Sequence, residues 1–419
     1  MEFLIPARTA RPSDDPIFAL NAEAQARTAA GEQVVNATVG ALLDDEGRLA
    51  VIPTVTQTLR EIEPQVGAGY APISGSQAFL DAVIHDLLGD RPEARQAVAA
   101  ATPGGSGALR HAIANFLERG QSLLTTSFYW GPYKTLSDES ERQLSTFRMF
   151  DENGRLDTVD FERKLRGVLD AQGRALVFLN SPCHNPTGYS FDDDEWRAVT
   201  DVVARESERG PIALLLDVAY ARYGGANAGN ESGGSSTADA LAGCLDRVLP
   251  VAGKALLLFA WSASKAFTQY GLRVGALVAV HPDAGERSRI QNALSYSCRG
   301  TWSNCNAGGM AAIARILGDA TLSARVEKER AQLKGLLDRR VAKWNELATA
   351  AKLRYPRYDG GFFTTVFCED APAVAARLKA AGVFVVPQAG ALRVALCSVP
   401  ERDVPRLVSA IQTAGAGRP

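Results

Sequence analysis

Lys265 stands in the string SASKAFTQYGLRVG, between two apolar runs, with Ser262 and Ser264 before it and Arg273 eight residues after it. A lysine whose pKa is lowered by its surroundings can form a Schiff base with a carbonyl compound. Two hydroxyls and a guanidinium can together bind a phosphate dianion. The segment therefore indicates covalent chemistry beside a phosphate site, although a lysine taken alone is usually an ordinary solvated side chain.

Three further segments hold polar groups where an apolar run ends. Glycines and Ser106 in TPGGSGALR precede a helical pattern, and free N–H groups at such a helix start suit a phosphate or simply a tight turn. Asn185, in NSPCHNPTG, lies in a turn and could donate its amide to a phenolate or carboxylate. Asp217 ends the run IALLLD and Tyr220 follows it. A buried acid there needs a protonated pyridine nitrogen, an ordinary ion pair or a capping role.

Apolar runs alternate with helical patterns through the middle of the chain. The runs SLLTT, RALVFLN, IALLLD, KALLLFA and RVGALVAV are typical of strands buried on both faces of a mostly parallel sheet. Between the second and third runs the pattern predicts a helix with Ser190 as its N-cap and a stop at Gly210 and Pro211. Because parallel sheets bind ligands outside the carboxyl ends of their strands, the four polar segments are expected at one edge.

The last hundred residues have a different pattern of apolar residues. It predicts a long amphipathic helix from about residue 320, then short apolar strands and a final helix that carries Leu407 and Ile411. These features predict a second α/β domain. The biased stretch from Gly224 to Ser236 is too small and polar to pack and is predicted to be a mobile loop.

Composition and charge narrow the class of partner. The chain has 45 basic and 47 acidic residues, a net charge of −2 and no long block of one sign, which argues against nucleic acid and membrane surfaces. No segment approaches the ~20 apolar residues of a membrane span, and the amino terminus lacks the apolar core of a signal peptide. Six cysteines without a C-x-x-C pair indicate free thiols and a cytoplasmic location. A small-molecule partner is expected, and no metal site.

Taken together, the four segments resemble one family in order and spacing. The strings CHNPTG, DVAY and SASKAFTQYGLRVG are similar to those of the fold-type I pyridoxal-5′-phosphate (PLP) aminotransferases, in the subgroup that acts on aspartate and aromatic amino acids. The resemblance implies an α/β fold in which a large domain, with a mostly parallel seven-stranded sheet between helices, is joined to a smaller α/β domain. It divides the chain into an amino-terminal segment (1–48) that packs with the small domain, a PLP-binding domain (49–319) and a small domain (320–419).

The resemblance also implies roles in holding the coenzyme. Lys265 would bind PLP as a Schiff base and carry the proton, Asp217 would pair with the pyridinium nitrogen, and Asn185 and Tyr220 would hydrogen-bond the phenolic oxygen. Trp130 would stack on the ring, if it is not simply a core tryptophan. The phosphate would be bound by Gly105, Ser106, Gly107, Ser262, Ser264 and Arg273.

Substrate and dimer contacts follow from the same resemblance. Ile17, Gly40, Asn185 and Phe363 would lie at the substrate site, and Arg393 would grip the α-carboxylate by a two-pronged hydrogen bond. In a homodimer, Tyr70 would cross to the partner's coenzyme phosphate and Arg299 would reach the partner's substrate. The sequence departs from the family pattern in a few places: Gly104 for serine, Tyr133 for the histidine behind the coenzyme aspartate, Cys305 and Asn306 for Pro-Pro, and the insertion after Tyr223.

The implied activity is a ping-pong transfer of an amino group between an L-amino acid of the aspartate or glutamate type and a 2-oxo acid. An aromatic donor, tyrosine or phenylalanine, is the first alternative, because such a donor could share a pocket from which Arg299 swings aside. Another fold-type I reaction, such as β-elimination or decarboxylation, would use the same coenzyme residues. A PLP-binding regulator would carry an added DNA-binding domain, and this chain has no room for one. A nucleotide-phosphate binder would carry the pattern G-x-x-x-x-G-K-[ST], which this sequence lacks.

Overall fold

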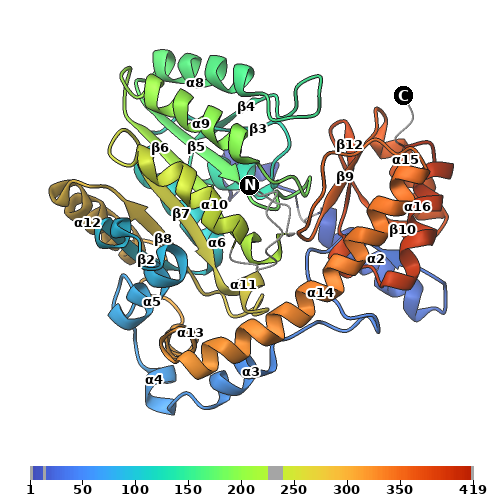
Figure 1. The fold of residues 1–419 in the computed structure, drawn as a ribbon, viewed down its shortest axis with the longest axis horizontal. Coiled ribbons are helices and arrows are strands. Elements are labelled where there is room, and N and C mark those ends of the chain that lie inside the picture. Colours follow the sequence, from blue (N-terminus) through green and yellow to red (C-terminus); the bar gives the residue numbers. More distant parts are fainter. Residues whose placement is uncertain (1–2, 13–15, 225–238, 417–419) are drawn as a thin grey trace. The chain divides into compact units, whose positions relative to one another are not determined.

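The computed structural model describes residues 3–12, 16–224 and 239–416. They form two compact units, which are described separately (Figure 1). The smaller unit comprises Met1–Leu49, Arg339–Tyr355 and Phe363–Pro419, and the larger unit comprises Ala50–Asp338 and Pro356–Phe362. Apart from Gly224, the stretch predicted to be a mobile loop lies outside the described residues.

A seven-stranded sheet forms the centre of the larger unit. Only β8 (Gly275–Val280) runs antiparallel to its neighbours β7 (Leu256–Ser262) and β2 (Ala97–Thr102), and the other strand pairs of this sheet are parallel. The mostly parallel seven-stranded sheet expected from the sequence is therefore confirmed. In spatial order the strands are β2 (Ala97–Thr102), β8 (Gly275–Val280), β7 (Leu256–Ser262), β6 (Ile212–Asp217), β5 (Ala175–Asn180), β3 (Ser122–Thr126) and β4 (Gln143–Phe147).

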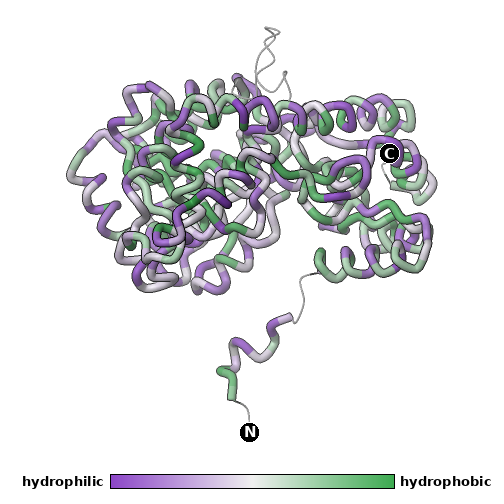
Figure 2. Tube along the Cα trace, turned by 90° about the horizontal axis from the view of Figure 1, so that it is seen from below, coloured by the Kyte–Doolittle hydropathy of each residue, from purple (hydrophilic) through white to green (hydrophobic). Residues whose placement is uncertain are grey.

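Both faces of this sheet are buried, which explains why its strands read as continuous apolar runs. Alternate side chains belong to different cores: Val177 and Leu214 to one, Phe178 and Leu215 to the other. The first core is completed by α5 (Gln77–Leu88), α8 (Thr158–Gln172), α9 (Asp193–Glu206), α10 (Asp239–Val248) and α13 (Ala307–Gly318). The second is completed by α6 (Gly104–Phe116), α7 (Pro132–Glu139) and α12 (Ala284–Arg299). Figure 2 shows the apolar stretches running through the interior, with polar segments mostly at the periphery.

The helices of the larger unit connect the strands and cover them. Their bounds are α3 (Pro53–Arg60), α4 (Pro64–Ala68), α5 (Gln77–Leu88), α6 (Gly104–Phe116), α7 (Pro132–Glu139), α8 (Thr158–Gln172), α9 (Asp193–Glu206), α10 (Asp239–Val248), α11 (Ala263–Ala266), α12 (Ala284–Arg299) and α13 (Ala307–Gly318). Short 3-10 helices are η1 (Pro92–Gln96), η2 (Ala221–Tyr223) and η3 (Leu249–Val251).

Helix α9 begins two residues later than its predicted cap. Asp192, not Ser190, is the N-cap, and it forms a capping box with Glu195. The Ser190 hydroxyl is used elsewhere, because it accepts the backbone N–H of Cys183 at 3.0 Å. The prediction of Ser190 as the cap was wrong, because Asp192 and Glu195 repeat the spacing of Ser190 and Asp193 two residues on, with better acceptors.

The smaller unit is built from two small sheets and their helices. Strand β1 (Val35–Asn36) pairs in parallel with β10 (Val383–Phe384), and β12 (Ala391–Val394) lies antiparallel between β11 (Val386–Gln388) and β9 (Thr364–Phe367). The helices are α1 (Pro6–Thr9), α2 (Pro16–Ala29), α15 (Ala371–Ala380) and α16 (Val404–Thr413), with η4 (Leu396–Ser398) and η5 (Glu401–Asp403). The strands and the final helix predicted for this part of the chain are present.

The chain changes units at Leu49 and again inside the long helix α14 (Ala320–Ala350), after Asp338. The first half of α14 belongs to the larger unit because it bonds there: Glu329 accepts the Thr54 hydroxyl at 2.8 Å, and Arg330 Nε donates to the Ala266 carbonyl at 2.6 Å. The chain later returns to the larger unit at Pro356–Phe362, which we call the return segment.

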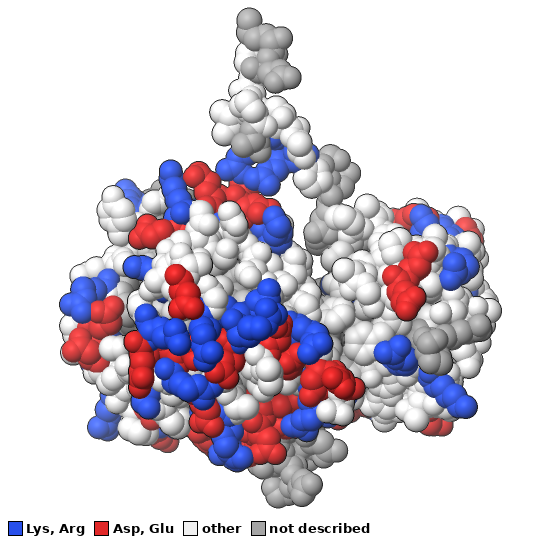
Figure 3. All heavy atoms as spheres, turned by 90° about the horizontal axis from the view of Figure 1, so that it is seen from above, with Lys and Arg blue, Asp and Glu red and all other residues white. Residues whose placement is uncertain are grey.

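The charges on one face of the molecule and the state of the cysteines can be compared with the sequence analysis. On the face drawn in Figure 3 basic and acidic side chains are intermixed, as on α8 and α9, where Arg166 pairs with Glu206 and Arg205 with Glu162, both at 2.8 Å. No helix within the described ranges is long and apolar enough to cross a membrane. All six cysteines are free thiols, as predicted.

Candidate active site

A cavity of about 200 Å³ lies at the carboxyl ends of the parallel strands of the larger unit. Ten of its lining residues were singled out in the sequence analysis, and they come from five separate segments of the chain. They are Gly105, Ser106, Trp130, Asn185, Asp217, Tyr220, Ser262, Ser264, Lys265 and Arg273. Leu109, Asn180 and Ala219 complete the wall.

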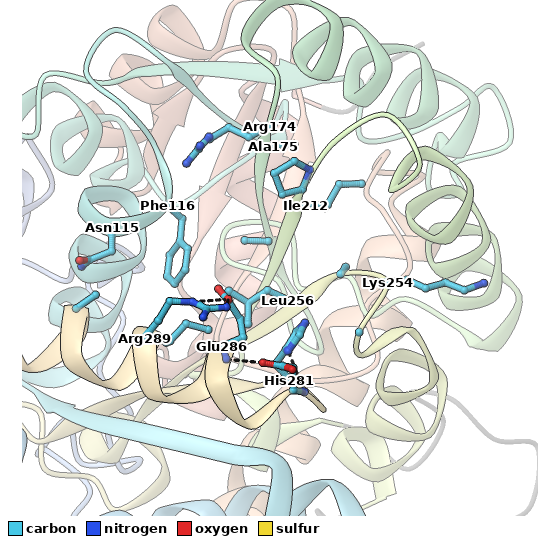
Figure 4. Close-up of a pocket in the computed structure, with 17 residues that line it drawn as sticks. Asn115, Phe116, Arg174, Ala175, Ile212, Lys254, Leu256, His281, Glu286 and Arg289 are labelled. Atoms are coloured by element: carbon cyan, nitrogen blue, oxygen red, sulfur yellow. Dashed lines mark hydrogen bonds and ion pairs between the residues drawn. The ribbon is translucent and has the colours of Figure 1, made fainter.

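A larger cavity, of about 650 Å³, lies at the opposite edge of the same sheet (Figure 4). It is bordered by Arg174, Ile212 and Leu256, at or just before the starts of β5, β6 and β7, and by α12. Its Arg289 is already paired with Glu286, and the polar segments that the sequence analysis singled out do not line it. The smaller cavity is therefore the candidate active site.

One end of the candidate site is suited to an anion. Helix α6 starts there with Gly104 and Gly105, so its first backbone N–H groups are free of intrahelical partners. The Arg273 guanidinium donates to Ser264 Oγ at 3.3 Å and to the carbonyl of Pro103 at 3.2 Å. Among the described residues no carboxylate pairs with Arg273. A phosphate dianion would supply the missing negative charge.

Gly107 has a packing role that the sequence analysis did not predict. It lies buried in the first turn of α6 and does not line the cavity. A Cβ at this position would come within 2.6 Å of the Pro103 ring and 2.9 Å of Thr102 Cβ. Gly107 therefore permits close packing of the helix on β2, and its role at the phosphate stays a prediction.

Gly104 is required by the position of Arg273. Its φ is +71°, and a Cβ there would lie 2.4 Å from Arg273 Nη2. We expect Gly104→Ala to destabilise the protein by about 1–2 kcal/mol, because alanine is strained at this φ, and to weaken PLP binding about 10-fold, because the flexible guanidinium must move off its position.

The measurement is titration of the apoenzyme with PLP, together with thermal unfolding. Gly167→Ala is the matched control, since a Cβ on that α8 residue meets nothing within 4 Å. Unchanged PLP affinity in Gly104→Ala would show that Arg273 does not hold the phosphate.

The other end of the candidate site offers a buried carboxylate. Asp217 is 6% exposed; its Oδ2 accepts the hydroxyl of Tyr133 at 2.8 Å and its Oδ1 accepts the N–H of Ala219 at 3.2 Å. Burial raises the pKa of Asp217, while these two hydrogen bonds and the charge of Lys265 act to lower it. A protonated ring nitrogen would provide the cation that a buried carboxylate requires.

Asn185 and Tyr220 face one another in the middle of the site. Asn185 Nδ2 donates to the Tyr220 hydroxyl at 3.1 Å, and both side chains are buried. Asn185 Oδ1 is a buried oxygen that finds no hydrogen-bond partner among the described residues. The pair therefore has hydrogen-bonding capacity left for a group bound in the cavity.

Asn180 is a functional position that the sequence analysis did not single out. It ends β5, and its Nδ2 donates to the Asp217 carbonyl at 2.7 Å while its Oδ1 accepts the Asn185 N–H at 2.6 Å. Asn180 thus fixes the turn that carries Asn185 relative to the strand that carries Asp217. The sequence did hold a signal for Asn180, because it is a polar residue at the end of a buried strand, as Asp217 is.

Lys265 projects from α11, whose N-cap Ser262 accepts the N–H of Ser264 at 3.2 Å. Its Nζ lies 5.5 Å from the centroid of the Tyr220 ring and 5.7 Å from that of Tyr270. The amine is therefore flanked by aromatic rings in the same cavity as the anion site and the buried carboxylate. These groups fit PLP, which has a phosphate, a pyridine nitrogen, a phenolic oxygen and an aldehyde for the amine.

Four predicted substrate residues belong to the smaller unit. Arg393, which is buried, donates through Nη2 to the Thr38 carbonyl, and its guanidinium lies over the Phe363 ring, 4.8 Å from the centroid. A Cβ on Gly40 would overlap that ring at 2.3 Å, so glycine is needed beside Phe363. Ile17 lies on α2 and is half-buried.

Tyr70 and Arg299 do not line the cavity. Tyr70 is 95% exposed. Arg299, also exposed, ends α12 and donates to Ser303 Oγ at 2.6 Å. Cys305, at one of the positions where the family has Pro-Pro, is buried.

Comparison with known proteins places this site in a family. The model of the family "Aminotransferase class I and II" matches residues 32–411. The chain is 29% identical over 344 residues to an aspartate aminotransferase of Pseudomonas aeruginosa, covering 80% of each chain. It is 30% identical to an aromatic-amino-acid aminotransferase of the same organism, covering 77% of each.

Solved structures agree with these relatives. An aminotransferase from Anaerococcus prevotii superposes with a TM-score of 0.91 at 29% identity, covering 99% of both chains. An aromatic-amino-acid aminotransferase from Burkholderia pseudomallei, covalently bound to pyridoxal phosphate, has the same fold, with a TM-score of 0.80 at 23% identity over 98% of this chain and 100% of that one.

The chain belongs to the class I and II aminotransferases. It is a PLP-dependent transaminase of fold type I, similar to the aspartate and aromatic amino-acid aminotransferases. The family and the coenzyme expected from the sequence are confirmed.

Proposed function

We propose that this enzyme moves an amino group between an L-amino acid of the aspartate or glutamate type and a 2-oxo acid, in two half-reactions of a ping-pong cycle. The observation that carries the proposal is the convergence of Lys265, Asp217 and Arg273 on one cavity at the carboxyl edge of the sheet. PLP supplies a carbonyl that takes the amino group and a ring that withdraws electrons from the donor's α-carbon.

The side chains of the cavity have separate tasks in this cycle. Lys265 Nζ would anchor the coenzyme and, as a free amine, would accept and hold the proton of the donor's α-carbon. Asp217 keeps the ring nitrogen protonated, and Asn185 with Tyr220 hydrogen-bonds the phenolic oxygen. Trp130 stacks on the ring. The phosphate is bound by the backbone of Gly105, Ser106 and Gly107 and by Ser262, Ser264 and Arg273.

Two arginines recognise the substrate in this proposal. Arg393 binds the α-carboxylate, with Ile17, Gly40 and Phe363 at the mouth of the substrate site, and Arg299 of one subunit binds the side-chain carboxylate at the partner's site. The exposure of Arg299 supports its use between subunits. The exposure of Tyr70 likewise supports a reach to the partner's coenzyme phosphate in a homodimer. We place the enzyme in the cytoplasm, because free thiols suit a reducing compartment.

An amino-acid panel tests the substrate class. The PLP form is mixed with single amino acids while the absorbance of the bound coenzyme is followed. We expect fast conversion with aspartate and glutamate and slow conversion with tyrosine and phenylalanine.

Arg299→Ala should lower kcat/KM for the two dicarboxylates about 10- to 100-fold, as expected for loss of a charged hydrogen bond. The kcat/KM for aromatic donors should change by less than about twofold.

The control is Arg287→Ala, which removes another arginine of α12. Within the described part of the chain, the Arg287 guanidinium donates to the carbonyls of His281 and Pro282 and to no other group. Faster conversion of tyrosine or phenylalanine than of aspartate, unaffected by Arg299→Ala, would make the aromatic alternative correct. The relative named for aromatic amino acids is as similar to this chain as the one named for aspartate, which keeps that alternative in view. Release of ammonia and a 2-oxo acid without an acceptor would instead indicate β-elimination.

A further inference from the structure

Tyr133 is a buried tyrosine whose hydroxyl is directed at the carboxylate of the coenzyme site. It lies in the first turn of α7, is 1% exposed and donates to Asp217 Oδ2 at 2.8 Å. Its backbone is fixed as well, since its N–H donates to the Trp130 carbonyl at 2.9 Å and its carbonyl accepts the Ser137 hydroxyl at 2.9 Å. The hydroxyl therefore has little freedom to turn away from Asp217.

The ring of Tyr133 is held between aromatic neighbours. It meets Phe178 edge-on with centroids 5.3 Å apart and a plane angle of 79°, and Trp130 at 5.9 Å and 90°. Tyr129 lies almost parallel to it at 6.5 Å. Edge-on packing of this kind gives each ring a defined orientation. One side chain thus touches both the residue proposed to stack on the coenzyme and the residue proposed to bind its nitrogen.

The direction of the hydrogen bond decides what Tyr133 does for Asp217. Burial, the charge of Asp217 and the hydrogen bond to it all raise the pKa of Tyr133 well above its usual value, so the phenol keeps its proton. The same hydrogen bond acts to lower the pKa of Asp217, against the effect of burial. The Tyr133 hydroxyl occupies one acceptor position of Asp217 Oδ2, and the carboxylate keeps further acceptor capacity for a ring N–H.

We propose that Tyr133 is a positioning residue for the coenzyme, which holds Asp217 as an oriented carboxylate against the ring nitrogen and fixes the edge of Trp130. The inference rests on the proposed role of Asp217. Nothing in it requires a proton to leave Tyr133, so the hydroxyl acts as a permanent donor.

The test compares PLP with an analogue in which a C–H group replaces the ring nitrogen. Apoenzyme is titrated with each compound, and the dissociation constants are measured for the wild type, Tyr133→Phe and Tyr129→Phe. Tyr133→Phe should weaken PLP binding about 10-fold, the loss expected for a hydrogen bond to a charged group, and should change the affinity for the analogue by less than about twofold. Tyr129→Phe is the matched control, because it removes a hydroxyl from the neighbouring ring and should leave both affinities near the wild-type values.

Two results would overturn the proposal. Equal weakening of PLP and analogue would mean that Tyr133 only packs, since a structural role does not distinguish the two rings. Unchanged PLP affinity would mean that the hydroxyl does not act on the coenzyme at all. Failure of the proposed function would look different: the wild type and both variants would bind PLP, and none of them would convert any amino acid.

Discussion

Lys265→Ala should abolish multiple turnover, with a fall in kcat on the order of 10⁴-fold or more, because the variant loses both the covalent anchor and the proton carrier. PLP should still bind, since Arg273, Asp217 and the start of α6 are untouched. Lys265→Arg should be no better, because a guanidinium keeps the charge but neither forms a Schiff base nor exchanges a proton near neutral pH.

Borohydride reduction followed by mass spectrometry checks this prediction directly. Wild-type protein should retain PLP covalently at Lys265 after reduction, and Lys265→Ala should not. The control is Lys254→Ala, which changes an exposed lysine beside the larger cavity and should keep full activity. A small primary amine added to Lys265→Ala should restore part of the rate if the missing group is the proton carrier. Turnover at the wild-type rate in Lys265→Ala would refute the assignment.

Asp217→Asn should lower kcat/KM about 10²- to 10³-fold, the loss expected when one partner of a buried ion pair is removed. The same substitution should not lower the stability of the apoenzyme and can raise it. Burial raises the pKa of Asp217 in the folded protein, so the ionised carboxylate destabilises the fold at every pH above the pKa that this group has when unfolded. Asparagine carries no charge, and apo Asp217→Asn should unfold at the same temperature as the wild-type apoenzyme or higher.

Steady-state kinetics and thermal unfolding at pH 7 measure the two effects. Asp201→Asn, on the exposed side of α9, is the matched control and should change neither. A marked fall in the melting temperature of apo Asp217→Asn would mean that the carboxylate stabilises the fold, which would contradict a pKa raised by burial. Unchanged kcat/KM would remove Asp217 from the site.

The central sheet could be predicted from the sequence because its strands are buried on both faces. Runs such as ALVFLN and IALLLD have no polar face to obscure them, and a polar residue at the end of each marks the edge where a ligand binds. Asp217 was found in this way. Asn180 ends the neighbouring strand and is paired in register with Asp217, yet its importance appears only when its two hydrogen bonds are seen.

Contacts between segments that are distant in the sequence were harder to predict than the strands. The position of Tyr133 behind Asp217 came only from resemblance, since no local pattern joins residues 84 positions apart in sequence. The collision between a Cβ on Gly104 and Arg273 depends on a backbone angle that the string PGGSG does not specify. The roles of Tyr70 and Arg299 in a dimer stay predictions, because a single chain contains one half of any such contact.

The return segment has a consequence for how this protein can be divided or recombined. Phe362 packs its ring on Tyr220 and Tyr223, with centroids 5.4 Å and 5.0 Å away, and Arg357 lies over the ring of Tyr189 at 4.5 Å. Both residues come from the carboxy-terminal part of the chain, and Phe362 packs against the phenol ring that faces Asn185. The two units are therefore not encoded as two continuous stretches that could be exchanged independently. An exchange of the carboxy-terminal part with a relative would carry Phe362 along with it, so the incoming chain must match Tyr220 as well as its own neighbours.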